Sequence, residues 1–181
     1  MNLAQLRITD IGADGLKIEA QLTEPWFAAL VREVLGENTR IDSTSRASLQ
    51  LQRDGDQIYL VGGAYLAWHP QCDRCLAPFE WQQQFPLHLV LLRTSKVAGY
   101  ANQNGAEDIE DLDVSGYEGD TINLIALLKE QLILQLPMSA RCSENCQGLC
   151  PTCGADRNKA PCTCPPTPTS SPFDVLRQLK R

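Results

Sequence analysis

Four stretches in the first half of the chain have the pattern of β-strands, and in three of them apolar and polar residues alternate with the two-residue period of a half-buried strand. These stretches cover residues 16–22, 47–52, 57–68 and 81–91. Because Asp54-Gly55 is a turn sequence, the second and third stretches are predicted to form a hairpin. The third stretch is apolar on both faces, which predicts a central strand, and Gly62-Gly63 within it predicts a β-bulge.

Two other stretches have the spacing of amphipathic helices. The first begins at Pro25, after Thr23 or Glu24 as a candidate cap, and ends near Gly36. The second runs from Leu124 to Leu136, with Asn123 as its cap and Pro137 at its end. The elements predict an α+β fold: a β-rich antiparallel sheet or partial barrel with two to three helices and a cysteine-rich zinc-knuckle tail.

Length and charge narrow the possible classes of protein. A chain of 181 residues suits one domain with a small appendage. Residues 1–11 include Arg7 and Asp10 and lack a continuous apolar run, so we expect neither an export signal nor a membrane span, and a cytoplasmic location. The formal charge of −6 disfavours direct RNA binding, which normally depends on clustered Lys and Arg.

Cysteine spacing is the strongest chemical signal. The eight cysteines form four close pairs: Cys72/Cys75, Cys142/Cys146, Cys150/Cys153 and Cys162/Cys164. Two pairs on tight turns supply the four thiolates of one structural zinc site, so four pairs predict two Zn²⁺ ions. We favour the first two pairs in one site and the last two in the other. Pairing Cys72/Cys75 with Cys150/Cys153 is the alternative partition.

Other uses of the cysteines stay open at this stage. A disulfide framework suits small secreted domains, and an iron–sulfur cluster or a redox dithiol is a further possibility. His69 lies three residues before Cys72 and is a candidate substitute ligand, although a plain strand residue is the preferred interpretation of both His69 and His88. Catalytic zinc needs an open coordination position, whereas sulfur here suffices to fill both shells.

An acidic stretch is the candidate surface for a protein partner. Its residues include Glu107, Asp108, Glu110, Asp111 and Asp113. They indicate either a solvated loop or a docking strip for a basic protein. Phe173 and Leu176 lie on the apolar side of a predicted C-terminal helix and are further candidates for partner binding.

The predicted organisation has four parts. Residues 1–140 form a β-rich body that includes an acidic loop at 101–120, and residues 141–164 form a cysteine-rich zinc-binding module. A Pro/Ser/Thr linker at 165–171 then leads to a C-terminal helix at 172–181.

Several motifs in order resemble the YceD family: C-D-R-C-L-A-P-F, L-L-K-E-Q-L-I-L-Q-L-P, C-Q-G-L-C-P-T-C-G, C-T-C and S-P-F-D-V-L-R-Q-L-K. The resemblance implies a noncatalytic ribosome-biogenesis factor that supports accumulation of 23S ribosomal RNA. Because genes of such proteins commonly neighbour that of a small basic zinc-ribbon protein of the large subunit, it also implies a basic ribosomal partner.

Two other function classes are kept as alternatives. One is an RNA-processing enzyme, although the chain has no phosphate-binding glycine loop, no HExxH sequence and no nucleophile elbow. The other is a redox or metal-delivery protein, in which the cysteines would react or exchange metal.

Overall fold

The structure is a computed structural model that describes residues 2–97, 113–160 and 162–165. It divides into two compact units. The first contains the residues up to Pro70 together with Glu80–Met138, and the second contains Gln71–Phe79 together with the described residues from Ser139 onward. No helix in the described part of the chain is long and apolar enough to cross a membrane.

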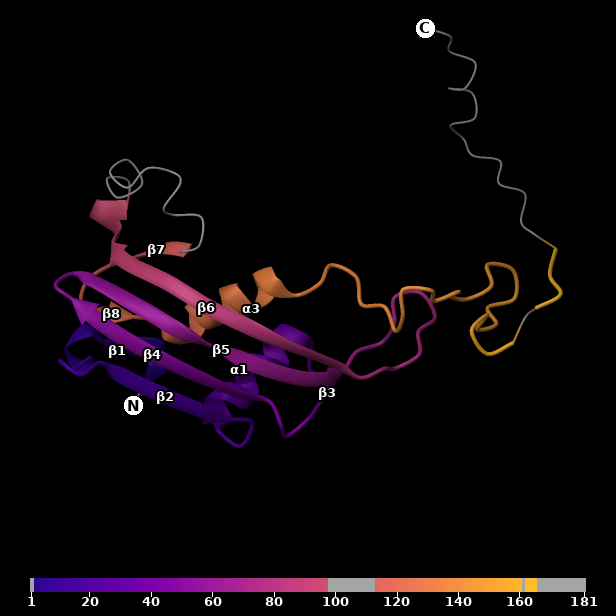
Figure 1. Cartoon of the computed structure of the whole chain (residues 1–181), viewed down its shortest axis with the longest axis horizontal. Helices are drawn as coiled ribbons and strands as arrows, with labels where there is room; N and C mark the ends of the chain where they lie inside the picture. Colours follow the sequence, from indigo (N-terminus) through magenta and orange to yellow (C-terminus); the bar gives the residue numbers. More distant parts are fainter. Residues whose placement is uncertain (1, 98–112, 161, 166–181) are drawn as a thin grey trace, which may run out of the picture. The chain divides into compact units, whose positions relative to one another are not determined.

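The first unit is built on an open, mostly antiparallel sheet (Figure 1). Its strands are β2 (Leu16–Gln21), β3 (Arg40–Ile41), β4 (Arg46–Asp54), β5 (Gln57–His69), β6 (Trp81–Arg93) and β7 (Asp113–Tyr117). The order is β2-β4-β5-β6-β7, and β3 also pairs with β5. All pairs are antiparallel except β6 with β7, which is parallel. Of the two expected architectures, the structure therefore has the sheet rather than the barrel.

Both long helices predicted from the sequence are confirmed. α1 (Pro25–Leu35) begins with proline at its first turn and ends at Gly36, whose φ of 97° is readily adopted only by glycine. α3 (Leu124–Gln135) is capped by Asn123, whose Oδ1 accepts a hydrogen bond of 3.0 Å from the backbone N–H of Ala126. Glu24 precedes α1 without a side-chain cap.

The amino terminus completes this unit. Short 3₁₀ helices η1 (Leu3–Gln5) and η2 (Ile8–Asp10) flank β1 (Leu6–Arg7), which pairs with β8 (Thr121–Ile122). Leu3, Leu6 and Ile8 are buried in the same core as the helices and the sheet.

One face of the sheet supplies most of the core. Alternate residues of β4, β5 and β6, such as Leu51, Leu60 and Leu89, pack with the buried sides of α1 and α3. The opposite face lacks this cover, so Val61 on the central strand β5 is 47% exposed. The central position of β5 is confirmed by its pairing with β4 and β6.

The predicted bulge at Gly62-Gly63 is wrong. β5 keeps a continuous register with β4 and with β6 through both glycines. The glycines instead permit close approach of the neighbouring strands. A Cβ atom at Gly62 would lie 2.1 Å from the Ser48 carbonyl oxygen, and one at Gly63 would lie 2.8 Å from the Phe85 carbonyl oxygen.

We therefore expect Gly62→Ala to destabilise the protein by about 2–4 kcal/mol, because it adds a backbone clash to a residue with φ of +148°. Thermal and denaturant unfolding measure the effect. Gly12→Ala is the matched control, since a Cβ at Gly12 meets no atom within 4 Å. Equal stability of the two variants would contradict this account of the glycine pair.

Candidate metal centres

Two C-x-x-C turns with the same backbone hydrogen bonds organise the second unit. In the first turn the Leu76 N–H donates to the Cys72 carbonyl, and in the second turn the Gly154 N–H donates to the Cys150 carbonyl. The Cys72 N–H donates to the Ala77 carbonyl, and the Cys150 N–H donates to the Ala155 carbonyl. The donor–acceptor distances are 2.8 and 2.9 Å for the turn that begins at Cys72, and 2.8 and 2.8 Å for the turn that begins at Cys150. The two turns are therefore copies of one local structure.

The residue after the second cysteine lies in the left-handed region in both turns. Gly154 has a φ of 72° there, which costs glycine little. Leu76 occupies the equivalent position with a φ of 59° and is the one described non-glycine residue with positive φ. A left-handed leucine costs about 1–2 kcal/mol, so other interactions must hold the first turn in this shape.

The first cluster brings together the sulfurs of Cys72, Cys75, Cys142 and Cys146, which all lie within 4.8 Å of one another. The Sγ atoms of Cys72 and Cys146 are 3.8 Å apart, and those of Cys75 and Cys142 are 3.7 Å apart. Four sulfurs at roughly 2.3 Å from one ion are separated by about 3.8 Å along each tetrahedral edge. A disulfide needs about 2.05 Å, so the spacing fits a shared ion and not a disulfide.

Hydrogen bonds fasten the two halves of this cluster to each other. The Asp73 N–H donates to the Ala140 carbonyl at 2.8 Å, and the Ala140 N–H donates to the Asp73 carboxylate at 2.7 Å. The Arg74 guanidinium donates to the Cys146 carbonyl at 2.9 Å. These contacts hold the first turn against the segment that carries Cys142 and Cys146.

The second cluster contains the sulfurs of Cys150, Cys153, Cys162 and Cys164, again within 4.8 Å of one another. Asn158 connects its loop to the first cluster. Its side-chain nitrogen donates to the Cys146 sulfur at 3.5 Å, and its Oδ1 accepts from the Gln147 N–H at 2.7 Å. Asp156 accepts from the Asn158 side chain at 2.7 Å and so fixes its orientation.

Each turn favours ionisation of its first cysteine. Burial raises the pKa of Cys72, but the backbone N–H groups of Cys142, Cys75 and Arg74 lower that pKa to about 6. For Cys150, the N–H groups of Cys153 and Thr152 are the main causes of a pKa lowered to about 6.

Each cluster also contains a thiol whose pKa is strongly raised. A hydrogen bond to Cys146 and burial raise the pKa of Cys142 to about 12. A hydrogen bond to Cys153 and burial likewise raise the pKa of Cys164 to about 12. A cation must therefore displace protons to obtain four thiolates at either site.

The structure groups the cysteines as the favoured partition does, and the alternative partition does not match the observed clusters. His69 ends β5 with its Nε2 3.2 Å from Asp42 Oδ2, and His88 lies exposed on β6. Neither joins a cysteine cluster among the described residues. Binding of an ion by the clusters stays a prediction.

Most predicted partner residues cannot be compared with the structure. Asp113 begins β7 and is exposed. The other candidates lie outside the described residues: Glu107, Asp108, Glu110, Asp111, Phe173 and Leu176. Sequence analysis also missed Asn158, whose position shortly after the second C-x-x-C turn was the available signal.

Residues 64–180 match the family described as large ribosomal RNA subunit accumulation protein YceD. The chain belongs to the YceD family. Among curated proteins, this YceD chain is 30% identical over 106 residues to uncharacterized proteins of Mycobacterium bovis and Mycobacterium tuberculosis. The match covers 59% of the chain and 48% of each relative, so the chain spans about half their length. No solved structure matches it.

Single cysteine substitutions test the partition in this YceD chain. We expect Cys75→Ser to release one metal ion and Cys153→Ser to release the other, because each removes one of four ligands. Native mass spectrometry of the Zn²⁺-loaded protein counts the ions. Thr152→Ala, within the second turn but without a sulfur, should keep both. Loss of both ions from either cysteine variant would contradict two separate sites.

Metal binding by the YceD chain should also release protons. At pH 7.5 the Cys142 and Cys164 thiols, with pKa values of about 12, are protonated, so each site loses at least one proton to bind an ion. Because only the deprotonated form binds, affinity for Zn²⁺ should rise with pH. Calorimetry in two buffers of different ionisation enthalpy measures the release. Identical heats in both buffers would contradict it.

Proposed function

We propose that this chain is a noncatalytic factor that supports the synthesis, processing or stability of 23S ribosomal RNA and holds two structural Zn²⁺ ions. Family membership supports the ribosomal RNA role. The observation that carries the zinc assignment is the 3.7–3.8 Å spacing of the sulfurs in the first cluster. That spacing matches the tetrahedral shell in which four thiolates bind zinc.

Structural rather than catalytic zinc fits the ligand set. Four cysteines fill a tetrahedral shell and leave no position for water or substrate. Cys72, Cys75 and Cys146 are at most 5% exposed, which limits solvent access to the first site. Ala77 and Phe79 are the partly buried apolar residues described as packed on these cysteines, so the apolar core there is small. Metal binding is then the main source of order in this unit.

We further propose that the chain docks a basic large-subunit ribosomal protein and acts on the RNA through it. The formal charge is −6, and each zinc bound by four thiolates adds a formal −2, giving about −10. Such a charge attracts a basic partner and speeds its association. The acidic stretch at 107–113 is the proposed docking strip, and Phe173 and Leu176 supply apolar contact.

A pull-down with graded salt washes tests the docking proposal. The tagged, zinc-loaded chain is incubated with bacterial lysate with and without nuclease. We expect a basic large-subunit protein to survive nuclease treatment and to elute as salt rises, because salt screens charge attraction. Retention of RNA without any ribosomal protein would contradict the docking proposal.

Charge-matched variants locate the docking surface. We expect neutralising Glu107, Asp108, Glu110, Asp111 and Asp113 to lower the eluting salt concentration. The control neutralises five exposed carboxylates elsewhere: Asp10, Asp14, Glu24, Glu37 and Glu130. If both sets weaken the partner equally, net charge alone explains the attraction and the strip has no special role.

A further inference from the structure

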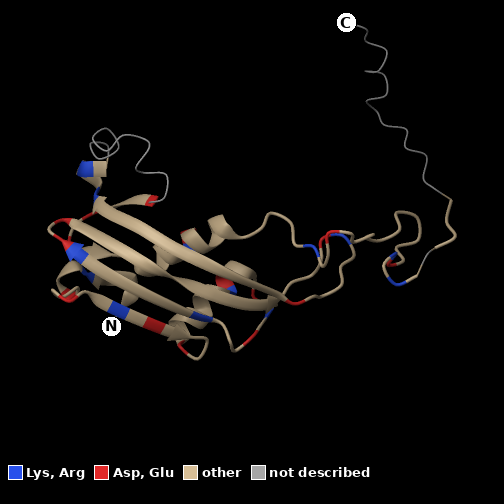
Figure 2. Cartoon of the chain, in the orientation of Figure 1, with Lys and Arg blue, Asp and Glu red and all other residues tan. Residues whose placement is uncertain are grey.

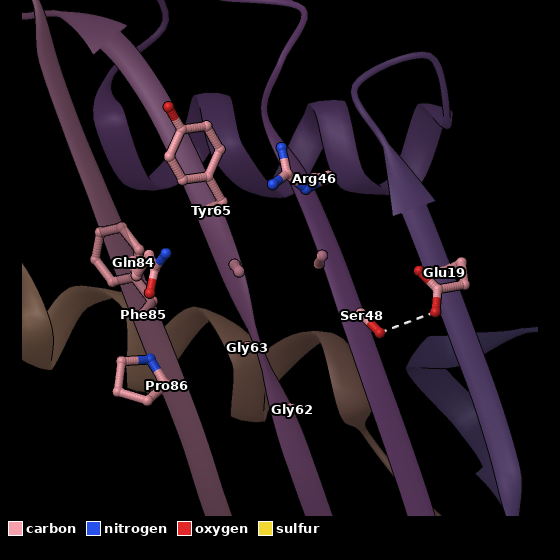
Figure 3. A pocket seen from close by; sticks show the side chains of 11 residues that line it. Glu19, Arg46, Ser48, Gly62, Gly63, Tyr65, Gln84, Phe85 and Pro86 are labelled. Atoms are coloured by element: carbon pink, nitrogen blue, oxygen red, sulfur yellow. Dashed lines mark hydrogen bonds between the residues drawn. The ribbon is translucent and has the colours of Figure 1, made fainter.

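A hollow of about 370 Å³ lies on the outer face of the sheet, opposite the helices (Figure 3). We call it the sheet hollow. Its lining includes Glu19 of β2, Arg46 and Ser48 of β4, Gly63 and Tyr65 of β5, and Gln84 of β6. The volume lies at the lower end of the roughly 300–1,000 Å³ typical of ligand sites. Nothing in the proposed zinc or docking roles uses this surface.

The glycine pair of β5 makes the hollow. Gly63 lies opposite Ser48 on one side and Pro86 on the other, in the row between those of Val61 and Tyr65. Because Gly63 has no side chain, the outer face is open down to the backbone at this position, between Ser48 and Pro86. Packing between the strands enforces this, since a Cβ at Gly63 would lie 2.8 Å from the Phe85 carbonyl oxygen.

One end of the hollow carries a stacked cation and ring. The Arg46 guanidinium carbon lies 4.8 Å from the Tyr65 ring centroid, within the range of a cation–π contact. The Tyr65 hydroxyl donates to Gln82 Oε1 at 2.9 Å, which steadies the ring. The Arg46 side chain makes one described hydrogen bond, to the Thr44 carbonyl at 3.3 Å, and no described ion pair. Its guanidinium therefore has N–H groups available for an anion.

Polar side chains, among them one carboxylate, line the rest of the hollow together with small and apolar residues. The Ser48 hydroxyl donates to Glu19 Oε1 at 2.8 Å, and Gln84 is exposed on the neighbouring strand (Figure 3). Carboxylate, hydroxyl and amide groups offer both acceptors and donors. This is the chemistry that recognises the hydrogen-bonding edge of a nucleobase.

The charge of this face differs from that of the whole protein. Within residues 17–21, 46–52, 59–65 and 82–88, Glu19 is the sole carboxylate, whereas the cations include Lys17 and Arg46. In Figure 2 the strands β4 to β6 correspondingly show almost no Asp or Glu, which are coloured red. A basic protein would gain little here, but a phosphate group would not be repelled. The face thus favours a nucleic-acid ligand over the basic partner proposed above.

We propose that the sheet hollow binds one unpaired nucleotide of single-stranded RNA. The base stacks on the Arg46–Tyr65 pair, while Ser48, Glu19 and Gln84 contact its edge and a guanidinium N–H donates to the phosphate. The inference rests on the ribosomal RNA role of the proposed function, and it is independent of zinc and of protein docking.

Fluorescence anisotropy with a labelled RNA octanucleotide and the purified, metal-loaded chain tests this site. We expect Tyr65→Leu and Arg46→Gln each to raise the Kd about tenfold, in line with the loss of one stacked base. Tyr59→Leu and Arg53→Gln are the matched controls on the same two strands, since neither residue lines the hollow, and they should leave the Kd within about twofold. Circular dichroism verifies that each variant is folded.

Salt dependence and competition separate the alternatives. One phosphate contact predicts a slope of about −0.7 in log affinity against log salt. Three results would overturn the proposal: a slope several-fold steeper than this, equal effects of the hollow and control variants on the Kd, or no binding of the octanucleotide by the wild type. RNA and a mononucleotide offer the hollow the same base and phosphate, so a mononucleotide that binds markedly more tightly than the octanucleotide would also overturn the proposal, in favour of a free nucleotide. Because no ribosomal protein is present, this result is independent of the pull-down.

Discussion

Four thiols confined within 4.8 Å of one another are the constraint on which the second unit depends. Without a cation, such a cluster cannot ionise fully, because each thiolate that forms raises the pKa of the remaining thiols. Backbone N–H groups lower the pKa of one thiol at each site, Cys72 and Cys150. The pKa of another thiol at each site, Cys142 and Cys164, is raised, so that thiol keeps its proton. The repeated turn therefore sets both the geometry and the proton balance that a divalent ion would meet.

Connectivity explains why the first cluster matters to the whole chain. Cys75 and Cys142 are separated in sequence by β6, β7, β8 and α3, yet their sulfurs lie 3.7 Å apart. An ion that joins them closes a long loop, and closing a long loop removes more entropy from the unfolded chain than closing a short one. The second cluster lies within Cys150 to Cys164 and closes a much shorter segment. Equal chemistry at the two sites thus has unequal consequences for stability.

Local signals predicted much of this architecture. Alternation identified β2, β4 and β6, and a stretch that is apolar on both faces identified β5. Helical spacing with a proline or an asparagine cap identified α1 and α3. Each of these signals depends on neighbours in sequence. The parallel pairing of β7 with β6 was not predictable, since a five-residue strand carries little periodic pattern. The glycine pair was misread as a bulge for a related reason. The strand spacing that excludes a Cβ atom is set by the neighbouring strands rather than by β5 itself.

The net charge of the chain does not describe each of its surfaces. The value of −6 for the chain disfavoured RNA as a direct ligand, but it averages over surfaces that differ. Strand pairing gathers Lys17, Arg46 and neutral side chains on one face of the sheet and leaves Glu19 there as its carboxylate, hydrogen-bonded to Ser48. Because screening limits charge effects to roughly 10 Å, a ligand at the sheet hollow responds to this local set and little to distant acidic residues. An acidic protein can therefore attract a basic partner at one surface and accept a nucleotide at another.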